Sequence, residues 1–210
     1  MKYAMRSLVK IKGVVAVSVF LVLSLVIALP VTKAAEEDND RKELITTKIF
    51  EYLKDKKVNA SEEKLRTIAS SVYEESQRYD IDYRLVLAVM KVESNFRHNA
   101  LSRKGARGLL QVKPSLARYI SKTSDIPVKN SKCLYEPEKN IKIGVNYLSR
   151  LIERFENVYT ALHAYNAGPR KVKRNTSDDE DEIPNNRFTR KVMKEYQQIA
   201  DILPDPTAEE

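Results

Sequence analysis

The chain has 210 residues with 5 glycines and 8 prolines, too few turn-forming residues for a many-stranded sandwich or barrel, and its 42% hydrophobic residues exclude wholesale disorder. Its formal charge of +8 comes mainly from residues 1–34, which hold five of the 37 bases and none of the 29 acids, so the rest of the chain has 32 bases against 29 acids. This balance argues against a nucleic-acid-binding protein, and the single cysteine, Cys133, excludes an internal disulfide framework.

The first 34 residues are typical of an export signal. A basic segment, residues 1–12, precedes an uncharged stretch over residues 14–29, and a small-x-small cleavage site follows at residues 32–34. A helix of about 16 residues spans roughly 24 Å, which is short of the roughly 30 Å hydrocarbon core. We therefore expect a cleaved signal peptide over residues 1–34, with an uncleaved membrane anchor as the alternative. Either way, the rest of the chain would be exported to the periplasm or cell envelope.

Helical patterns begin soon after the signal. Residues 35–60 are predicted to form a polar leader and a short amphipathic helix, and Asn59 is expected to cap the helix that follows. A third helix begins after Asp82 and is apolar on all sides from Leu85 to Met90, which predicts a central place in the core. Glu93 lies at the C-terminal end of this helix.

Loop and helix signals alternate in the second half of the chain. Residues 95–108 lack a helical period and contain two glycines, which indicates an ordered loop, and a short helix is predicted after Pro114. Asn140 is expected to cap a helix that carries Tyr147 on its packing stripe. A further helix is predicted to stop at the Asn-Ala-Gly-Pro sequence of residues 166–169.

The chain ends with an acidic run, a last helix and a tail. Residues 177–182 are predicted to be a solvated acidic loop, and residues 203–210 a disordered acidic tail. No segment shows the alternating pattern of a strand. We therefore expect an all-α fold of about seven to nine helices, with residues 61–202 as the folded domain.

Glu93 is the residue whose setting most suggests chemistry. A carboxyl group at the inner end of an apolar helix loses hydration, which raises its pKa and keeps a proton available near neutral pH. Such a group can act as a general acid. The structural alternative is an ion pair between Glu93 and Lys91 or Arg97.

Three separated blocks of sequence extend this interpretation. They are Glu93-Ser94-Asn95-Phe96, Gly108-Leu109-Leu110-Gln111-Val112 and Ala164-Tyr165-Asn166-Ala167-Gly168-Pro169. In this order they resemble the catalytic domain of the lytic transglycosylases, of the soluble-lytic-transglycosylase (SLT) type, over about Ile68 to Tyr196. The resemblance implies a compact, lysozyme-like, all-α domain.

The resemblance also implies an activity on peptidoglycan. The bond cleaved would be the β-1,4 bond between N-acetylmuramic acid and N-acetylglucosamine, with Glu93 as the single catalytic acid and base and with no cofactor or metal. The muramic 6-hydroxyl would close on C1 and leave a 1,6-anhydro end. The implied glycan-binding residues are Ser94, Ser102, Gln111, Tyr147, Tyr165 and Asn166. Tyr165 would hold Glu93 or the substrate through its hydroxyl, and Asn166 would fix the turn that follows its helix.

The sequence departs from the family pattern near the predicted site. Arg97-His98 stands where the family often has Asn-Pro, and Lys113 stands where a cleft-lining Met is usual. Neither His98 nor His163 has a second ligand at metal-binding spacing, so no metal site is expected. Cys133 is expected to be a packing residue.

Two other functions stay open from the sequence alone. One is a hydrolytic muramidase, in which water traps the intermediate and leaves a reducing muramic end. The other is a noncatalytic wall-binding module or secretion-apparatus component built on the same fold. The expected partners are peptidoglycan glycan strands, with an envelope protein as a further candidate, and the expected state is a monomer.

Overall fold

A computed structural model of the chain describes residues 36–124, 126–172 and 186–206. The chain divides into two units, residues 1–44 and residues 45–210. The described part of the first unit, residues 36–44, is helical, so the predicted polar leader includes helix; the predicted signal and the acidic run lie outside the described residues. No helix among the described residues combines the length and the apolar character needed to cross a membrane.

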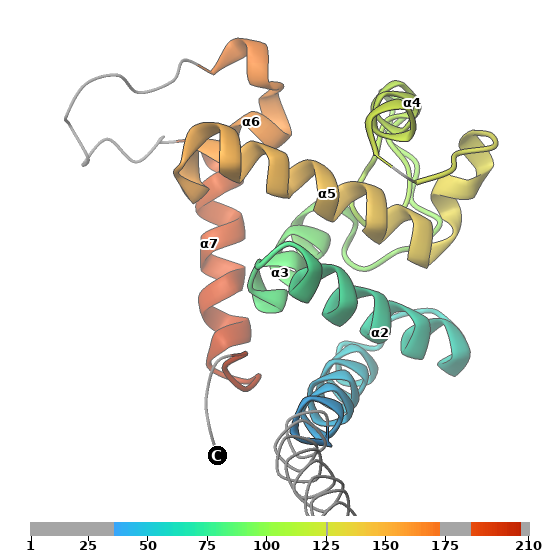
Figure 1. The fold of residues 1–210 in the computed structure, drawn as a ribbon, viewed down its shortest axis with the longest axis vertical. Coiled ribbons are helices and arrows are strands. Elements are labelled where there is room, and N and C mark those ends of the chain that lie inside the picture. The colour runs from blue at the N-terminus through green and yellow to red at the C-terminus, as the bar shows by residue number, and fades with distance from the viewer. Residues whose placement is uncertain (1–35, 125, 173–185, 207–210) are drawn as a thin grey trace, which may run out of the picture. The chain divides into compact units, whose positions relative to one another are not determined.

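The second unit is built from helices, and a long loop over residues 95–113 joins α3 to α4 (Figure 1). After helical residues 45–55 come α2 (Glu62–Arg78), α3 (Tyr83–Ser94), α4 (Pro114–Thr123), α5 (Pro137–Phe155), α6 (Val158–Ala167) and α7 (Arg187–Ala200), with 3-10 turns η1 (Ser131–Tyr135) and η2 (Pro169–Lys171). Extended pairing within the described residues is limited to isolated bridges that join Arg107 to Leu101 and Val112. The all-α prediction is confirmed.

Helix α3 forms the centre of the domain, as its apolar sequence predicts. Every residue from Tyr83 to Met90 is buried, and α3 packs against α2 and α7. Helix α5 in turn packs against α2 and α6 (Figure 1). Each fully buried Leu or Val side chain stabilises the fold by roughly 1.5–3 kcal/mol. The helix that ends at Glu93 is therefore held firmly in place.

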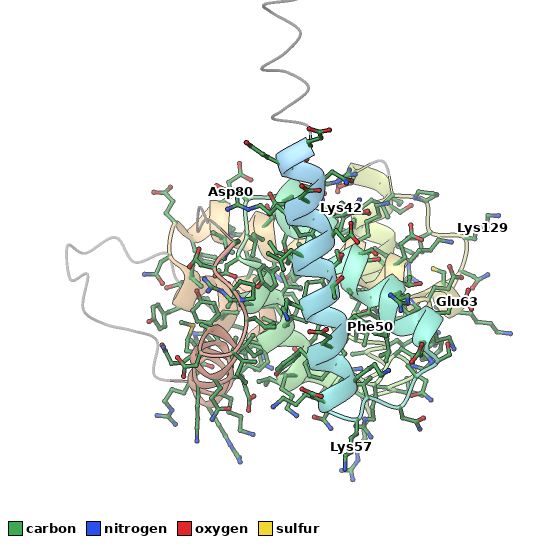
Figure 2. The ribbon with its side chains drawn as sticks, turned by 90° about the horizontal axis from the view of Figure 1, so that it is seen from below. Lys42, Phe50, Lys57, Glu63, Asp80 and Lys129 are labelled. Carbon is green, nitrogen blue, oxygen red and sulfur yellow. The ribbon has the colours of Figure 1, made fainter. Side chains whose placement is uncertain are left out.

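Helical residues 45–55 belong to the same core. Ile45, Ile49 and Leu53 recur at intervals of four, and all three are buried in the main hydrophobic cluster. Figure 2 shows Phe50 on this helix, where its ring also contacts the guanidinium of Arg66 at 4.3 Å. The folded domain thus begins before residue 61, its predicted start.

The helix caps are partly as predicted. Asp82 caps α3 by accepting a hydrogen bond from the Arg84 backbone N–H at 2.8 Å, as expected. The prediction that Asn59 caps α2 is wrong: the cap is Ser61, whose hydroxyl accepts from the Lys64 N–H. Ser61 directly precedes the first helical residue in an extended conformation, which is the position that capping requires.

Asn140 does not begin a helix, contrary to the prediction. Pro137 occupies the first turn of α5, where its missing N–H costs no hydrogen bond, so the helix begins three residues earlier. Asn140 lies within α5, and its side chain is fully buried. Its Oδ1 accepts from the Leu110 N–H, and its Nδ2 donates to the carbonyls of Arg107 and Leu134, each at 2.8 Å. One side chain therefore ties α5 to the loop before α4.

The C-terminal segment is ordered as far as it is described, which contradicts the prediction of a disordered tail from residue 203. Leu203 is buried in the core, and the buried hydroxyl of Tyr83 donates to the Pro204 carbonyl. Asp205 accepts from the buried guanidinium of Arg84 at 2.9 Å. A buried cation and a buried hydroxyl both need partners, and these residues supply them.

Gly144 allows the loop to approach α5 one turn after Asn140. A Cβ atom on Gly144 would lie 2.4 Å from Cδ1 and 2.7 Å from Cβ of Leu110. Alanine usually stabilises a helix by about 1 kcal/mol relative to glycine. For Gly144→Ala we expect the opposite, a loss of about 1–3 kcal/mol in the free energy of unfolding, because Leu110 must move. Urea unfolding measures this, and an unchanged or higher stability would show that Leu110 does not need Gly144.

Candidate active site

Glu93 lies in the last turn of α3, where the chain turns sharply out of the helix. Asn95 ends the helix in the left-handed conformation at φ 51°, and Phe96 follows at φ 60°. Left-handed backbone is strained for a bulky residue such as Phe. The buried Phe96 ring is held edge-on to Tyr52 at 6.1 Å and under the ammonium of Lys91 at 5.8 Å. Packing of this ring fixes the turn beside Glu93.

The Glu93 carboxyl group is half-buried and has no hydrogen-bond or ion-pair partner among the described residues. Burial raises its pKa from about 4.5 to about 7. Both expected ion-pair partners are engaged elsewhere: Lys91 Nζ donates to Asn95 Oδ1 at 2.6 Å, and Arg97 Nε donates to the Ser94 carbonyl at 3.0 Å. The structural alternative for Glu93 is therefore wrong, and its carboxyl group is suited to carry a proton at neutral pH.

The raised pKa of Glu93 also makes stability depend on pH. Between about pH 4.5 and 7 the unfolded chain has lost the Glu93 proton while the folded chain keeps it, so stability falls as the pH rises through this window. At 1.36 kcal/mol per pH unit, the loss reaches up to about 3 kcal/mol above pH 7. We expect Glu93→Gln to be more stable than the wild type at pH 8 and nearly equal at pH 4.5. Thermal unfolding at both pH values checks this; equal stability at pH 8 would contradict the burial of Glu93.

Tyr165 and Tyr147 form a pair of rings, and Tyr165 is the member of the pair that interacts with Glu93. The buried hydroxyl of Tyr165 on α6 donates to the Leu110 carbonyl at 2.8 Å. Burial raises the pKa of Tyr165 well above 10, and the charge of Glu93 raises it further, which shows that the two groups interact. The ring of Tyr147 on α5 lies 5.5 Å from that of Tyr165. The Tyr165 hydroxyl therefore holds the loop, and it forms no hydrogen bond with Glu93.

Ser102 and Gln111 lie in the loop that Asn140 and Tyr165 hold. The Ser102 hydroxyl accepts from the Ala106 N–H at 2.9 Å, and its own O–H remains free to donate. Gln111 has a left-handed backbone at φ 47°, and its Nε2 donates to the Gly108 carbonyl at 2.9 Å. The Gln111 Oε1 accepts no hydrogen bond from the described residues. Ser102 is thus fixed by one hydrogen bond and Gln111 by two, since its Nε2 also donates to the Ala100 carbonyl at 3.4 Å. Each side chain keeps a further hydrogen-bonding function.

Ser94 and Asn166 are placed differently from the other predicted site residues. Ser94 is 2% exposed, and its hydroxyl donates to the Met90 carbonyl of its own helix at 3.1 Å. This is a packing contact, so we do not retain Ser94 among the glycan-binding residues. Asn166 is exposed and helical, and the residue that ends α6 with positive φ is Gly168 at 93°. The expectation that Asn166 fixes this turn is therefore wrong.

The residues that depart from the family pattern are accounted for in part. Lys113 is exposed and precedes the first residue of α4. His98 Nε2 lies 3.3 Å from the ammonium of Lys64. Cys133 is buried, as expected, and its thiol lies 2.8 Å from the Asn130 carbonyl. In the described ranges, no three His, Cys, Asp or Glu residues gather in a group that could hold a metal ion.

Two residues have a role at the site that the sequence did not predict. Asn140 and Gly144 are one turn apart on α5 and together dock the loop, yet neither belongs to a block with reactive side chains. The available signal was an Asn-x-x-x-Gly spacing within an apolar stripe. It places a polar side chain on a buried face, where it must find partners.

A family model described as the transglycosylase SLT domain matches residues 70–188, more than half of the chain. The chain belongs to this family. The match includes α3, the loop before α4, α5 and α6, which carry Glu93, Ser102, Gln111, Tyr147 and Tyr165.

Several named proteins are similar to this SLT domain. Membrane-bound lytic murein transglycosylase C from Actinobacillus succinogenes is 38% identical over 117 residues, covering 51% of this chain and 33% of the relative. Soluble lytic murein transglycosylase from Salmonella typhimurium is 38% identical over 96 residues, covering 45% and 15%. A solved inactive mutant of lytic transglycosylase Slt from Pseudomonas aeruginosa superposes with a TM-score of 0.56 at 25% identity, covering 66% and 25%. The chain thus spans a third or less of these relatives.

Proposed function

We propose that this SLT domain is a peptidoglycan lytic transglycosylase. It would cleave the β-1,4 bond between N-acetylmuramic acid and N-acetylglucosamine and leave a 1,6-anhydro muramic end. The observation that carries the proposal is Glu93, a half-buried carboxyl group with a pKa of about 7 next to Tyr165. The names of the relatives and the solved inactive mutant, which carries a Glu-to-Gln exchange, support it.

In the proposed reaction Glu93 acts twice. It first donates its proton to the glycosidic oxygen, so that the C1–O bond breaks and an oxocarbenium-like centre forms at the muramic C1, assisted by the N-acetyl carbonyl. The Glu93 carboxylate then takes the proton of the 6-hydroxyl as O6 bonds to C1. Glu93 ends the cycle protonated, and no water is consumed. A pKa near 7 suits both steps, because the acid and the base are then comparably available at neutral pH.

The electrostatics of Glu93 favour a single-carboxylate mechanism over a muramidase with two acids. A second carboxylate within the 5 to 9.5 Å that such glycosidases use would raise the pKa of Glu93 through its charge. Burial is the cause of the shift of Glu93, and no carboxylate among the described residues contributes to it. Asp82 is engaged by Arg84, and Glu136 is exposed and paired with Lys139 at 3.1 Å.

The remaining substrate contacts are proposed from the groups left free around Glu93. The Ser102 hydroxyl hydrogen and the Gln111 carbonyl oxygen suit the hydroxyl and N-acetyl N–H groups of the glycan. Tyr147 and Tyr165 offer ring faces, and Asn166 is exposed at the end of α6. A noncatalytic wall-binding role is less well supported, because binding alone has no use for a carboxyl group with a raised pKa.

Location in the cell envelope forms part of the proposal. Residues 1–34 have the pattern of an export signal or anchor, and peptidoglycan lies outside the cytoplasmic membrane. The relatives are named both membrane-bound and soluble, so their names agree with either fate of the signal. The expectations of a monomer, of no metal or cofactor and of an envelope protein partner remain predictions.

The test is to digest purified peptidoglycan with the chain and to determine the masses of the released muropeptides. Anhydro-ended products, lighter by one water than reducing-ended ones, are expected. Reducing-ended products would replace the proposal with a muramidase. Binding to peptidoglycan without any released product would instead favour the noncatalytic module.

A further inference from the structure

A line of three tyrosine rings leads from Glu93 toward the protein surface. Tyr165, next to Glu93, contacts Tyr147 with ring centroids 5.5 Å apart. Tyr119 on α4 continues the line along the same side of α5, because its ring contacts the guanidinium of Arg150, which follows Tyr147 by one turn. Tyr165 and Tyr147 are partly buried, whereas 54% of Tyr119 is accessible to solvent. Tyr119 is one of the few large apolar side chains that the described part of the chain exposes, and it is continuous with the candidate active site.

Arg150 fixes the position of Tyr119. It lies one turn after Tyr147 on α5, on the same side of the helix, and its guanidinium is 5.9 Å from the centre of the Tyr119 ring. Three of its N–H groups are used: Nη1 donates to Thr123 Oγ1 at 2.9 Å, and Nη2 donates to the Thr123 carbonyl at 3.0 Å and to Ser124 Oγ at 2.6 Å. These bonds attach the end of α4 to α5. The ring of Tyr119 is therefore held on an anchored helix.

Arg150 keeps binding capacity after it has anchored α4. A guanidinium has five N–H donors, so two remain available. Arg150 forms no ion pair with any described residue, so its charge is not neutralised there. An exposed aromatic ring beside a fixed cation presents an apolar face and a carboxylate-binding group together.

We propose that Tyr119 and Arg150 form an additional glycan subsite, in which the Tyr119 ring stacks on a sugar face and Arg150 binds a carboxylate of the same strand. The inference rests on the proposed function, and it adds a contact remote from the bond that breaks. The ligand class is a glycan that carries carboxylates, either free lactyl groups or stem peptides. Because both residues are fixed before binding, little ordering cost opposes the contact.

The first test compares kcat/KM for long stem-bearing strands with kcat/KM for the shortest fragment that the wild type cleaves. We expect Tyr119→Ala to lower kcat/KM about tenfold on the long strands and less than twofold on the short fragment, because a remote subsite acts only on substrates that reach it. Tyr119→Phe keeps the ring and should behave like the wild type. Arg118→Ala is the matched control, since Arg118 is exposed on the same helix and forms no ion pair with the described residues.

The second test addresses the carboxylate. Converting the carboxylates of long strands to neutral methylamides should lower kcat/KM about tenfold for the wild type and less than twofold for Arg150→Gln. The ratio of kcat/KM for unblocked and blocked strands, taken within one variant, does not depend on how much active protein that variant yields. The same blocking is then applied to strands freed of their stems, which expose lactyl carboxylates. If blocking lowers kcat/KM more on stem-bearing strands, the stem supplies the carboxylate; if it lowers kcat/KM more on stem-free strands, the lactyl group does.

The outcomes separate this inference from the proposed function. If the wild type cleaves both substrates but Tyr119→Ala loses activity equally on both, or on neither, the subsite is refuted and the lytic activity stands. If blocking the carboxylates affects the wild type and Arg150→Gln equally, Arg150 has no part in binding. If the wild type cleaves neither substrate, the proposed function fails and the subsite with it.

Discussion

The Glu93→Gln variant is expected to lose at least about a thousandfold in kcat on peptidoglycan, because general acid and general base catalysis each contribute about 10² to 10⁴ and Glu93 supplies both in the proposed mechanism. Gln keeps the shape of the side chain but has no proton to give to the glycosidic oxygen. Release of anhydro-muropeptides, followed by mass, measures the effect. Thermal unfolding at the assay pH should show a fold at least as stable as the wild type.

Glu136→Gln is the matched control for this variant. Glu136 is an exposed carboxylate at the start of α5 and pairs only weakly with Lys139, as exposed ion pairs do. Its kcat should stay within about twofold of the wild type. A Glu93→Gln protein that retained more than about a tenth of the wild-type kcat would show that another group protonates the leaving sugar.

The second large effect concerns Asn140, which holds the loop under the site. Asn140→Asp replaces the amide nitrogen with an oxygen that faces the carbonyls of Arg107 and Leu134, and it buries an acid without a cation. Each buried group left without its partner costs about 1–3 kcal/mol. We expect the free energy of unfolding to fall by at least about 3 kcal/mol, and activity to fall with it, as urea unfolding and muropeptide release would show.

Asn130→Asp makes the same chemical change at an exposed site. Asn130 Oδ1 accepts from the Lys132 N–H at 2.8 Å, a bond that Asp retains. Its stability should change by less than about 0.5 kcal/mol. Equal effects of the two substitutions would mean that the three hydrogen bonds of Asn140 do not hold the loop.

The position of Glu93 could be predicted from the sequence because it depends on local pattern. An apolar run capped by Asp82 specifies α3, and the helix length then places Glu93 at its buried end. Desolvation of the carboxyl group follows from that placement alone. The ordered loop and the short helix after Pro114 were likewise evident from glycine and proline positions.

The interactions that assemble the site could not be predicted in the same way. Asn is a residue type that often caps helices, so Asn140 was predicted to be a cap. Only its burial against a loop 30 residues away in sequence reveals its different role. The order of residues 203–206 depends on the buried Arg84, a partner 121 residues away from Asp205. Such long-range partners leave no periodic signal in one sequence.

The role of Ser94 was predicted wrongly from its position next to Glu93. It adjoins Glu93 in a block that resembles a catalytic motif, and adjacency suggested substrate binding. On a helix, however, neighbouring residues point about 100° apart, so Ser94 is directed into the core while Glu93 stays partly open. Tyr119 and Arg150 lie outside every motif, yet the packing of α4 on α5 brings them into contact.

The central claim is that one carboxyl group with a pKa near 7 is both acid and base, and the pH dependence of kcat/KM on a soluble glycan fragment tests it most directly. Burial of Glu93 predicts a profile that is level at acid pH, turns at about pH 7 and then falls tenfold per pH unit. A bell-shaped profile, with an acid limb from a second carboxylate that must be ionised, would contradict the account. A single turn near the ordinary glutamate pKa of about 4.5 would contradict it equally, since Glu93 would then not be desolvated.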